Sequence, residues 1–157
     1  MKTLADSIAF QCSNIAESWG EAFPLLLAHH REVGALPQER FRPDREFYLR
    51  LEGAGVLDVY TMRDCGKLVG YASFVVMPEH GHYPGSVWAK QDALYVAPSH
   101  RGPVAADFIR WQDEKLRSKY PGVEILRQST ARRDFSGLLE VLGYRQVETA
   151  YLLDRKG

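Results

Sequence analysis

The sequence contains few cysteines and no long apolar run. Its 157 residues include two cysteines, Cys12 and Cys65, which are too few for a disulfide framework. No apolar stretch approaches the roughly 20 residues that a membrane-spanning helix needs. Residues 1–6 also lack the apolar core of a secretion signal. We therefore expect a cytoplasmic protein with reduced thiols.

The chain also has no net charge, with 20 basic and 20 acidic side chains. A zero balance gives no reason to expect a nucleic-acid or membrane partner. The charge is unevenly distributed: residues 1–100 carry 9 basic and 12 acidic side chains, and residues 101–157 carry 11 and 8. A small basic surplus in the last third suits a polyanionic ligand there.

Internal repeats, low-complexity segments and linkers are absent, so we expect a single domain over residues 1–157. Hydrophobic periodicity predicts a helix ending near Val33, with Ser18 and Glu21 as its capping box. Pro24 either kinks this helix or lies in its first turn, and we favour the first turn. A second helix is predicted over residues 43–52, with Phe47, Tyr48 and Leu51 facing inward.

The remaining elements follow from β-branched runs, turns and a second helical stripe. We predict a hairpin over 56–63 and 68–77, a strand over 86–96, a helix over 104–120, a strand over 123–128, a short helix ending at Gly143, and one or two strands over 144–154. In the long helix, Asp113 is expected on the polar side. This order predicts an α/β or α+β fold with helices around one mixed sheet.

The most informative segment joins the strand over 86–96 to the long helix. Ala97-Pro98-Ser99-His100 forms a loop, and Arg101-Gly102 turns into the helix start. The first backbone N–H groups of a helix have no acceptor within the helix, and the helix dipole favours negative charge there. The segment is therefore a candidate anion site.

This segment resembles the coenzyme A pyrophosphate loop of the GNAT N-acetyltransferase superfamily, whose pattern is Arg/Gln-x-x-Gly-x-Gly/Ala. The sequence here is Arg101-Gly102-Pro103-Val104-Ala105-Ala106, with Val104 replacing the central glycine. The resemblance covers residues 15–154 and implies a GNAT fold, acetyl-CoA as the acetyl donor and strands that splay at its site. It implies these acetyl-CoA-binding residues: Leu94, Tyr95, Val96, Arg101, Gly102, Pro103, Val104, Ala105, Ala106, Ser129, Thr130 and Phe135. For Ser129 and Thr130, the equal alternative is that the hydroxyls cap the next helix.

The resemblance also implies a carboxylate base on the strand before the loop. Asp92 occupies about that place, and counting back by two from Val96 puts both side chains on one face. A pairing of Asp92 with Lys90 or Arg127 is the alternative. His82 and Tyr83, in the loop over 78–85, are further catalytic candidates.

Many relatives place a proton-donating tyrosine where this chain has Leu139. Tyr83, Tyr95 and Tyr144 are the possible replacements, and spacing does not choose among them. The loop histidines His80 and His82 have no third partner at metal-ligand spacing, so we expect no metal site.

Two functions remain open from the sequence. The first is an N-acetyltransferase acting on an amine of a small molecule or a protein. The second is a weak or inactive GNAT-fold module that binds coenzyme A or a protein, which Val104 and Leu139 favour. The family also suggests a homodimer, and some short stretches are similar to members from tailed phages.

Overall fold

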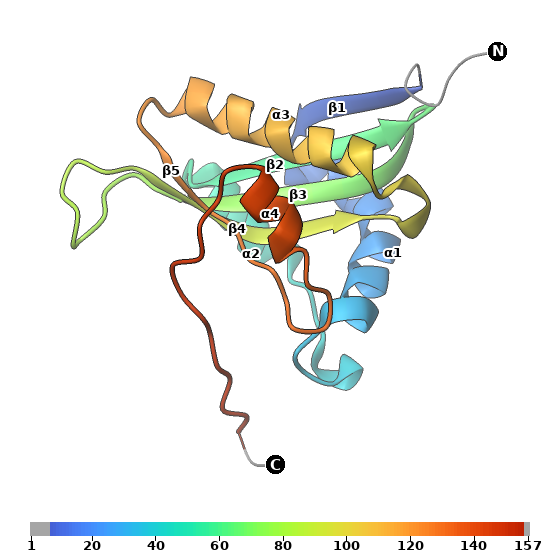
Figure 1. Cartoon of the computed structure of the whole chain (residues 1–157). Helices are drawn as coiled ribbons and strands as arrows, with labels where there is room; N and C mark the ends of the chain where they lie inside the picture. The colour runs from blue at the N-terminus through green and yellow to red at the C-terminus, as the bar shows by residue number, and fades with distance from the viewer. Residues whose placement is uncertain (1–6, 156–157) are drawn as a thin grey trace.

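The computed structural model describes residues 7–155 and contains one five-stranded sheet in the order β1-β2-β3-β4-β5 (Figure 1). Strands β1 to β4 pair antiparallel, whereas β5 pairs with β4 in parallel. The strands are β1 (Ile8–Ser13), β2 (Leu57–Asp64), β3 (Lys67–Met77), β4 (Trp88–Val96) and β5 (Glu124–Leu126). The predicted mixed sheet is confirmed.

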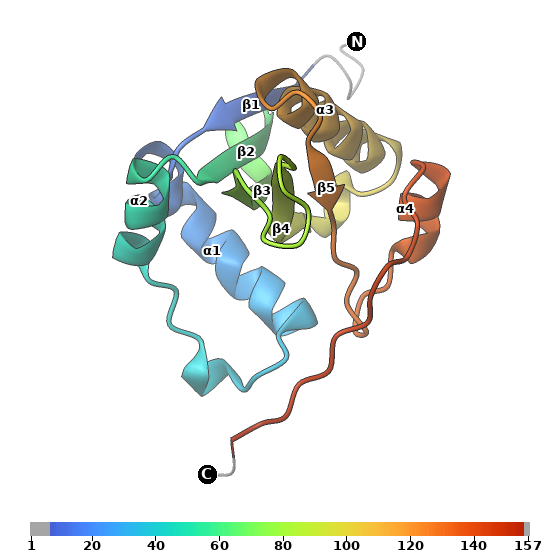
Figure 2. The same cartoon turned by 90° about the vertical axis from the view of Figure 1, so that its left-hand side faces the viewer.

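Helices cover both faces of this sheet. Figure 2 shows α1 and α2 on one face and α3 on the other. The helices are α1 (Ile15–Val33), α2 (Arg45–Gly53), α3 (Pro103–Lys119) and α4 (Ser136–Val141), and short 3₁₀ turns lie at Gln38–Arg40 and Pro98–His100. The core is divided accordingly. Phe74, Phe108 and Leu116 are fully buried between the sheet and α3, while Ile15, Leu57 and Val59 pack against the α1–α2 side.

The N-terminal prediction needs correction, because the chain begins with a strand that the sequence analysis missed. The first helix then begins at Ile15, and its cap is the Asn14 side chain, which accepts from the N–H of Glu17 over 2.9 Å. Ser18 is buried and donates to the carbonyl of Asn14. Pro24 therefore lies inside α1 rather than in its first turn. The predicted lack of a secretion signal concerns residues 1–6, which lie outside the described residues.

Three further predictions were wrong in detail. Phe47 is 46% exposed, so of the predicted α2 stripe only Tyr48 and Leu51 pack inward, together with Leu49. Asp113 is buried rather than on a solvated face. The segment 144–154 forms no strand and is exposed over most of its length, because no neighbouring strand pairs with it. Figure 1 shows it running away from the sheet.

Candidate functional site

Strands β4 and β5 are paired only over a short stretch. Trp88, Ala89 and Lys90 face Glu124, Ile125 and Leu126, and beyond this point the two strands have no ladder. The N–H of Ala97 donates to the carbonyl of Val69 in β3 over 2.8 Å. Backbone groups alternate along an antiparallel strand, so those of Leu94 and Val96 turn away from β3 toward the β5 side. The unpaired part of β4 is therefore a sheet edge that can bind an extended ligand.

A β-bulge interrupts β4 at Asp92. Ser73 pairs with Ala93, and the next residue of β3, Phe74, pairs with Gln91, so Asp92 is an extra residue. Bulges change the direction in which a side chain points and are frequent next to active sites. Here the bulge directs the Asp92 side chain to the α1–α2 face.

The predicted shared face of Asp92 and Val96 is therefore wrong. Val96 belongs to the core cluster that contains Phe108 of α3, on the other side of the sheet. Counting by two from Val96 fails because the extra residue at the bulge shifts the alternation by one position.

The carboxylate of Asp92 is held by two hydroxyl groups. Its Oδ2 accepts a hydrogen bond from Ser73 Oγ over 2.9 Å and from Tyr48 Oη over 3.1 Å. Burial, followed by the nearby charge of Asp92 and its hydrogen bond, raises the pKa of Tyr48 well above its ordinary value. Tyr48 therefore stays protonated and donates to the carboxylate. The alternative partners Lys90 and Arg127 do not pair with Asp92.

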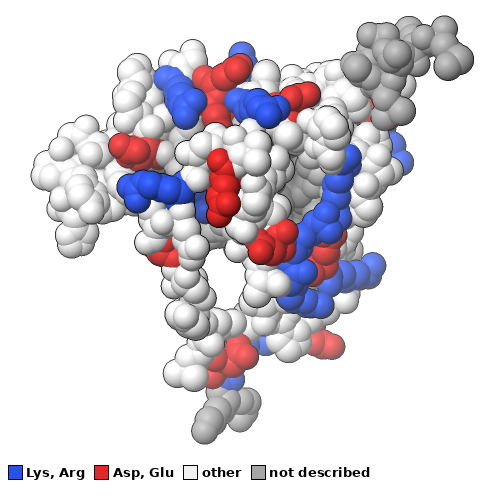
Figure 3. Space-filling model, viewed as in Figure 1, with Lys and Arg blue, Asp and Glu red and all other residues white. Residues whose placement is uncertain are grey.

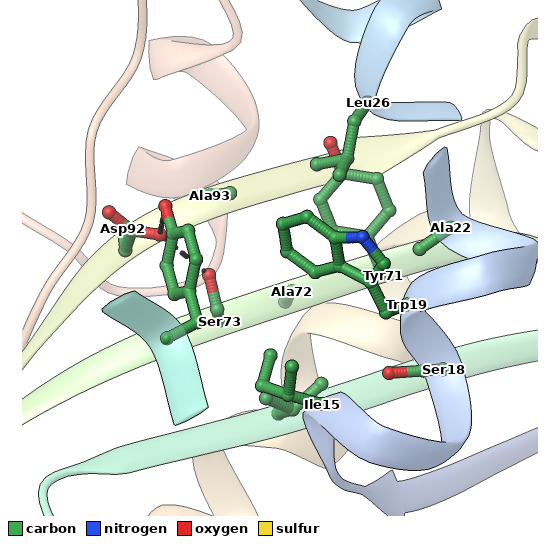
Figure 4. Close-up of a pocket in the computed structure, with 12 residues that line it drawn as sticks. Ile15, Ser18, Trp19, Ala22, Leu26, Tyr71, Ala72, Ser73, Asp92 and Ala93 are labelled. Atoms are coloured by element: carbon green, nitrogen blue, oxygen red, sulfur yellow. Dashed lines mark hydrogen bonds between the residues drawn. The ribbon is translucent and has the colours of Figure 1, made fainter. Parts of the chain in front are cut away.

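Asp92 lies at the edge of a pocket between α1, α2 and the sheet (Figure 4). The walls are mostly carbon, and Trp19 projects from α1 across Tyr71 and Ala72 of β3. The lining residues are Ile15, Ser18, Trp19, Ala22, Leu26, Tyr48, Val59, Tyr71, Ala72, Ser73, Asp92 and Ala93. Asp92 itself is exposed, so its carboxylate is accessible from solvent.

A cluster of rings extends this pocket toward the end of β4. His29 Nδ1 shares a hydrogen bond of 2.7 Å with Tyr71 Oη, and the imidazole stacks on the ring of Tyr95 with centroids 5.1 Å apart. Burial lowers the pKa of His29 and raises that of Tyr71, so both groups are neutral at neutral pH. Tyr95, a predicted cofactor residue, is buried and contributes its ring to this cluster.

The turn into α3 has the geometry of an open helix start. Gly102 adopts φ 101°, a conformation that favours glycine, and its carbonyl accepts from the N–H groups of Ala105 and Ala106 at 3.1 Å each. The N–H groups of Gly102 and Val104 make no hydrogen bond within residues 7–155, and Pro103 has none to donate. Of the N–H groups of Gly102, Val104, Ala105 and Ala106, the first two therefore remain open and the last two are used at the helix start. The Val104 side chain packs against the core.

Arg101 points back into the protein rather than toward the helix start. Its Nε donates to the carbonyl of Val96 over 2.8 Å, and its Nη2 pairs with Glu32 of α1 over 2.7 Å. Arg133 Nε reaches the same carboxylate over 3.0 Å. Burial opposes the ionisation of Glu32, but the hydrogen bond and charge of Arg101 and the charge of Arg133 lower its pKa overall. Arg101 thus braces the turn.

Basic side chains gather on the right-hand side of the face drawn in Figure 3, with acidic ones between them.

Ser129 and Thr130 form the turn that precedes α4. The alternative that their hydroxyls cap this helix is wrong, because its N-cap, Phe135, has no side-chain cap hydrogen bond. Ser129 Oγ accepts from the N–H of Phe135 over 2.8 Å and donates to Asp134, while Thr130 Oγ1 bonds the backbone of Arg133. Phe135 is half-buried at the start of α4. The acetyl-CoA contacts of these three residues stay predictions, and the hydroxyls already have local partners.

The loop over 78–87 places His82 and Tyr83 away from Asp92. Both are exposed, and neither lines the pocket. Tyr83 stacks on Trp88 with ring centroids 5.8 Å apart, at the opposite end of β4 from the turn into α3. Their catalytic roles stay predictions without support from this geometry. Tyr48, Ser73 and Tyr71 are instead the groups that the fold brings to Asp92 and that sequence reasoning did not assign a role.

Arg127 forms a buried network behind the site. Its guanidinium pairs with Asp113 of α3 over 2.6 Å and donates to Gln91 of β4 and to Tyr144 Oη. Tyr144 Oη also donates to Asp113 over 2.8 Å, and burial is the main reason that its pKa is raised to about 12. Tyr144 is thus fixed in a structural network. Leu139, in the position of the usual tyrosine, is buried.

No group of three or more His, Cys, Asp or Glu side chains within residues 7–155 is arranged to hold a metal ion. The same part of the chain contains no helix that is both long and apolar enough to cross a bilayer.

No protein-family model matches the sequence, and no curated protein matches it. Solved structures do match. A ribosomal-protein-alanine N-acetyltransferase from Brucella melitensis biovar Abortus 2308 superposes with a TM-score of 0.72 and 19% identity, covering 96% of this chain and 99% of its own. The chain has the GNAT acyltransferase fold.

Two further structures share this fold. An aminoglycoside acetyltransferase from an uncultured soil metagenomic sample, in complex with sisomicin, has a TM-score of 0.70 and 16% identity, and covers 97% of this chain and 100% of its own. A predicted acetyltransferase from Clostridium acetobutylicum with acetyl-CoA has a TM-score of 0.63 and 10% identity, and covers 94% of this chain and 96% of its own. The expected GNAT fold is therefore confirmed.

Proposed function

We propose that this protein is an acetyl-CoA-dependent N-acetyltransferase that acetylates a primary amine. The observation that carries the proposal is the position of Asp92. The bulge of β4 holds its carboxylate at the mouth of a pocket, four residues before the strand end that leads into the open start of α3. A proton acceptor, an acceptor pocket and an anion site thus lie along one strand. The GNAT fold of the solved acetyltransferases supports the same activity.

The chain's own groups fit acetyl-CoA. The open amides of Gly102 and Val104 suit a diphosphate, and no side chain occupies the space at Gly102. The backbone groups of Leu94 and the N–H of Val96 suit an extended amide-containing arm on the β5 side, whereas the Val96 carbonyl already accepts from Arg101. When bound, acetyl-CoA supplies an activated thioester.

Asp92 accepts the proton that the acceptor ammonium must lose before its nitrogen can attack the thioester carbonyl. After the nitrogen has attacked, it loses its second proton to solvent. As the carbon–sulfur bond breaks, the released thiolate takes up a proton from solvent, and Asp92 gives its own proton back to solvent, so the products are an N-acetyl amide, free thiol and one proton. Ser73 and Tyr48 hold the carboxylate in place. Positioning of the two substrates supplies much of the remaining rate enhancement.

Titration calorimetry with acetyl-CoA, followed by a thiol-release assay over a panel of primary amines, tests the proposal. We expect saturable binding and amine-dependent release of thiol. An absence of binding at millimolar acetyl-CoA would contradict it. Binding without thiol release would favour the second function, a coenzyme A-binding module. Our proposal treats residues 1–157 as one acetyltransferase domain. A cytoplasmic location, a homodimer and a phage-type origin remain predictions.

A further inference from the structure

Most polar groups that line the acceptor pocket are already hydrogen-bonded within the protein. Four of its lining hydroxyls already have protein partners: Ser18 Oγ donates to the Asn14 carbonyl, Tyr71 Oη bonds His29, and Ser73 and Tyr48 both donate to Asp92. Both of the last two bonds go to Oδ2 of Asp92. Within residues 7–155, Oδ1 of this carboxylate has no hydrogen-bond partner. The pocket therefore offers a ligand one anionic oxygen, the indole N–H of Trp19 and otherwise mostly carbon surface.

The carbon surface is formed mainly by aromatic rings. Trp19 of α1 and Tyr48 of α2 lie with their ring centroids 6.0 Å apart and their planes inclined by 45°. Tyr71 is buried on the sheet side of the pocket, and Leu26 and Ile15 extend the apolar wall. Ring faces in this arrangement accept an aromatic group edge-on or offset. They also attract a cation that is not fully hydrated.

We infer that the acceptor is an arylalkylamine: a primary monoamine whose ammonium pairs with Asp92 and whose aromatic body lies against Trp19 and Tyr48. This inference rests on the proposed function, since it names the substrate class of the same site. One ammonium group matches the single free carboxylate oxygen, and an apolar body matches the walls.

A polyamino sugar fits this pocket poorly. It carries several ammonium and hydroxyl groups, and each of them would lose water against carbon walls without gaining a partner. The metagenomic aminoglycoside acetyltransferase shares the fold at 16% identity. The walls of this chain's pocket argue for a different acceptor.

Three matched compounds test the inference on the unmodified protein. The first is 2-phenylethylamine, the second is ethanolamine, which keeps the amine and lacks the ring, and the third is the aminoglycoside sisomicin. Burial of a phenyl group contributes about 1.5–3 kcal/mol, so we expect kcat/KM for 2-phenylethylamine to exceed that for ethanolamine by about 10- to 100-fold. Equal or better use of ethanolamine or sisomicin would overturn the inference and leave the acetyltransferase proposal intact.

Substitutions of Trp19 test whether the aromatic wall causes the expected preference for 2-phenylethylamine. Trp19→Ala should lower kcat/KM for 2-phenylethylamine at least about tenfold and leave that for ethanolamine within about twofold, because only the first compound uses the ring. Trp19→Phe keeps a ring and should retain most of the preference, which covers the case that the alanine variant folds poorly. Phe23→Ala, at an exposed site on the same helix, is the matched control. Equal losses for both amines in Trp19→Ala would contradict the inference.

A binding measurement keeps the two proposals distinguishable. If the wild-type protein acetylates no amine, titration with 2-phenylethylamine and with ethanolamine still tests the pocket. Tighter binding of 2-phenylethylamine by about tenfold or more, lost in Trp19→Ala, supports the inference about the pocket, although the proposed activity would then fail. Equal or undetectable binding of both amines overturns it.

Discussion

Asp92→Asn separates proton acceptance from the shape of the pocket. Asparagine has nearly the same size, and its amide oxygen can still accept the bonds that Ser73 donates over 2.9 Å and Tyr48 over 3.1 Å. A hydrogen bond is worth about 1 kcal/mol with a neutral acceptor and about 1.5–3 kcal/mol with a charged one. Solvent screens this difference because Asp92 is exposed. We expect the free energy of unfolding to fall by less than about 1 kcal/mol, which shifts Tm by less than about 4 °C.

Activity should respond far more strongly than stability. Asparagine cannot take the proton of the ammonium, and loss of a general base costs about 10²- to 10⁴-fold. The thiol-release assay at saturating acetyl-CoA, with the amine varied, measures this loss as kcat/KM. The deficit should shrink as the pH approaches the pKa of the amine, about 10, since free amine then needs no base. Tyr48→Phe keeps the carboxylate and should lose less than about tenfold. A kcat/KM within twofold of wild type for Asp92→Asn would refute the assignment.

The remaining predictions concern the groups around the site. Arg127→Met leaves the buried Asp113 without its cationic partner and with only the hydrogen bond from Tyr144, so we expect about 3 kcal/mol lower stability and a Tm about 6–12 °C lower in a thermal melt. Arg101→Ala removes the brace of the turn and should raise the Kd of acetyl-CoA about tenfold by calorimetry. The Val104 side chain packs against the core and not over the open amides, so Val104→Gly should not tighten the binding of acetyl-CoA. An unchanged Kd in Arg101→Ala would contradict the loop assignment. Burial lowers the pKa of His29, so its neutral form stabilises the fold above the ordinary pKa of about 6.5. That contribution should be lost as the pH falls through the lowered pKa, and denaturant unfolding of His29→Gln should show a smaller loss of stability below pH 6.5.

The periodic part of the fold was predictable from the sequence, whereas the first strand and the irregular segment 144–154 were not. The helix over 104–120 and the hairpin strands carry strong apolar patterns, and the structure has them at nearly the predicted bounds. The strand Ile8–Ser13 was missed because it is a six-residue edge strand that is only partly buried. The segment 144–154 has β-forming residues, but a strand exists only where another strand pairs with it, and sequence composition does not supply that partner.

The residues of the candidate site were likewise only partly predictable from the sequence. Asp92 was identified from its place before the loop, and Tyr48 was correctly placed on the inner side of its helix. The meeting of the two was not predictable, because they are 44 residues apart and the face of Asp92 depends on a bulge. Counting residues by two along a sequence does not reveal the extra residue of a bulge. Burial of Asp113 was likewise missed, since its partner Arg127 lies on another element.

Helix α1 contributes residues to both the acceptor pocket and the proposed acetyl-CoA site, and its length separates these two sites. Trp19, near its start, lines the acceptor pocket, whereas Glu32, near its end, holds Arg101 at the turn into α3. At 1.5 Å per residue, their separation of 13 positions corresponds to about 20 Å along the helix. Sites farther apart than about 10 Å with no shared partner have additive effects within about 0.5 kcal/mol. The loss of kcat/KM in the double variant Trp19→Ala/Arg101→Ala should therefore be the product of the two single fold losses, because the corresponding free energies add. A larger coupling would mean that the acceptor pocket and the acetyl-CoA site move together through α1.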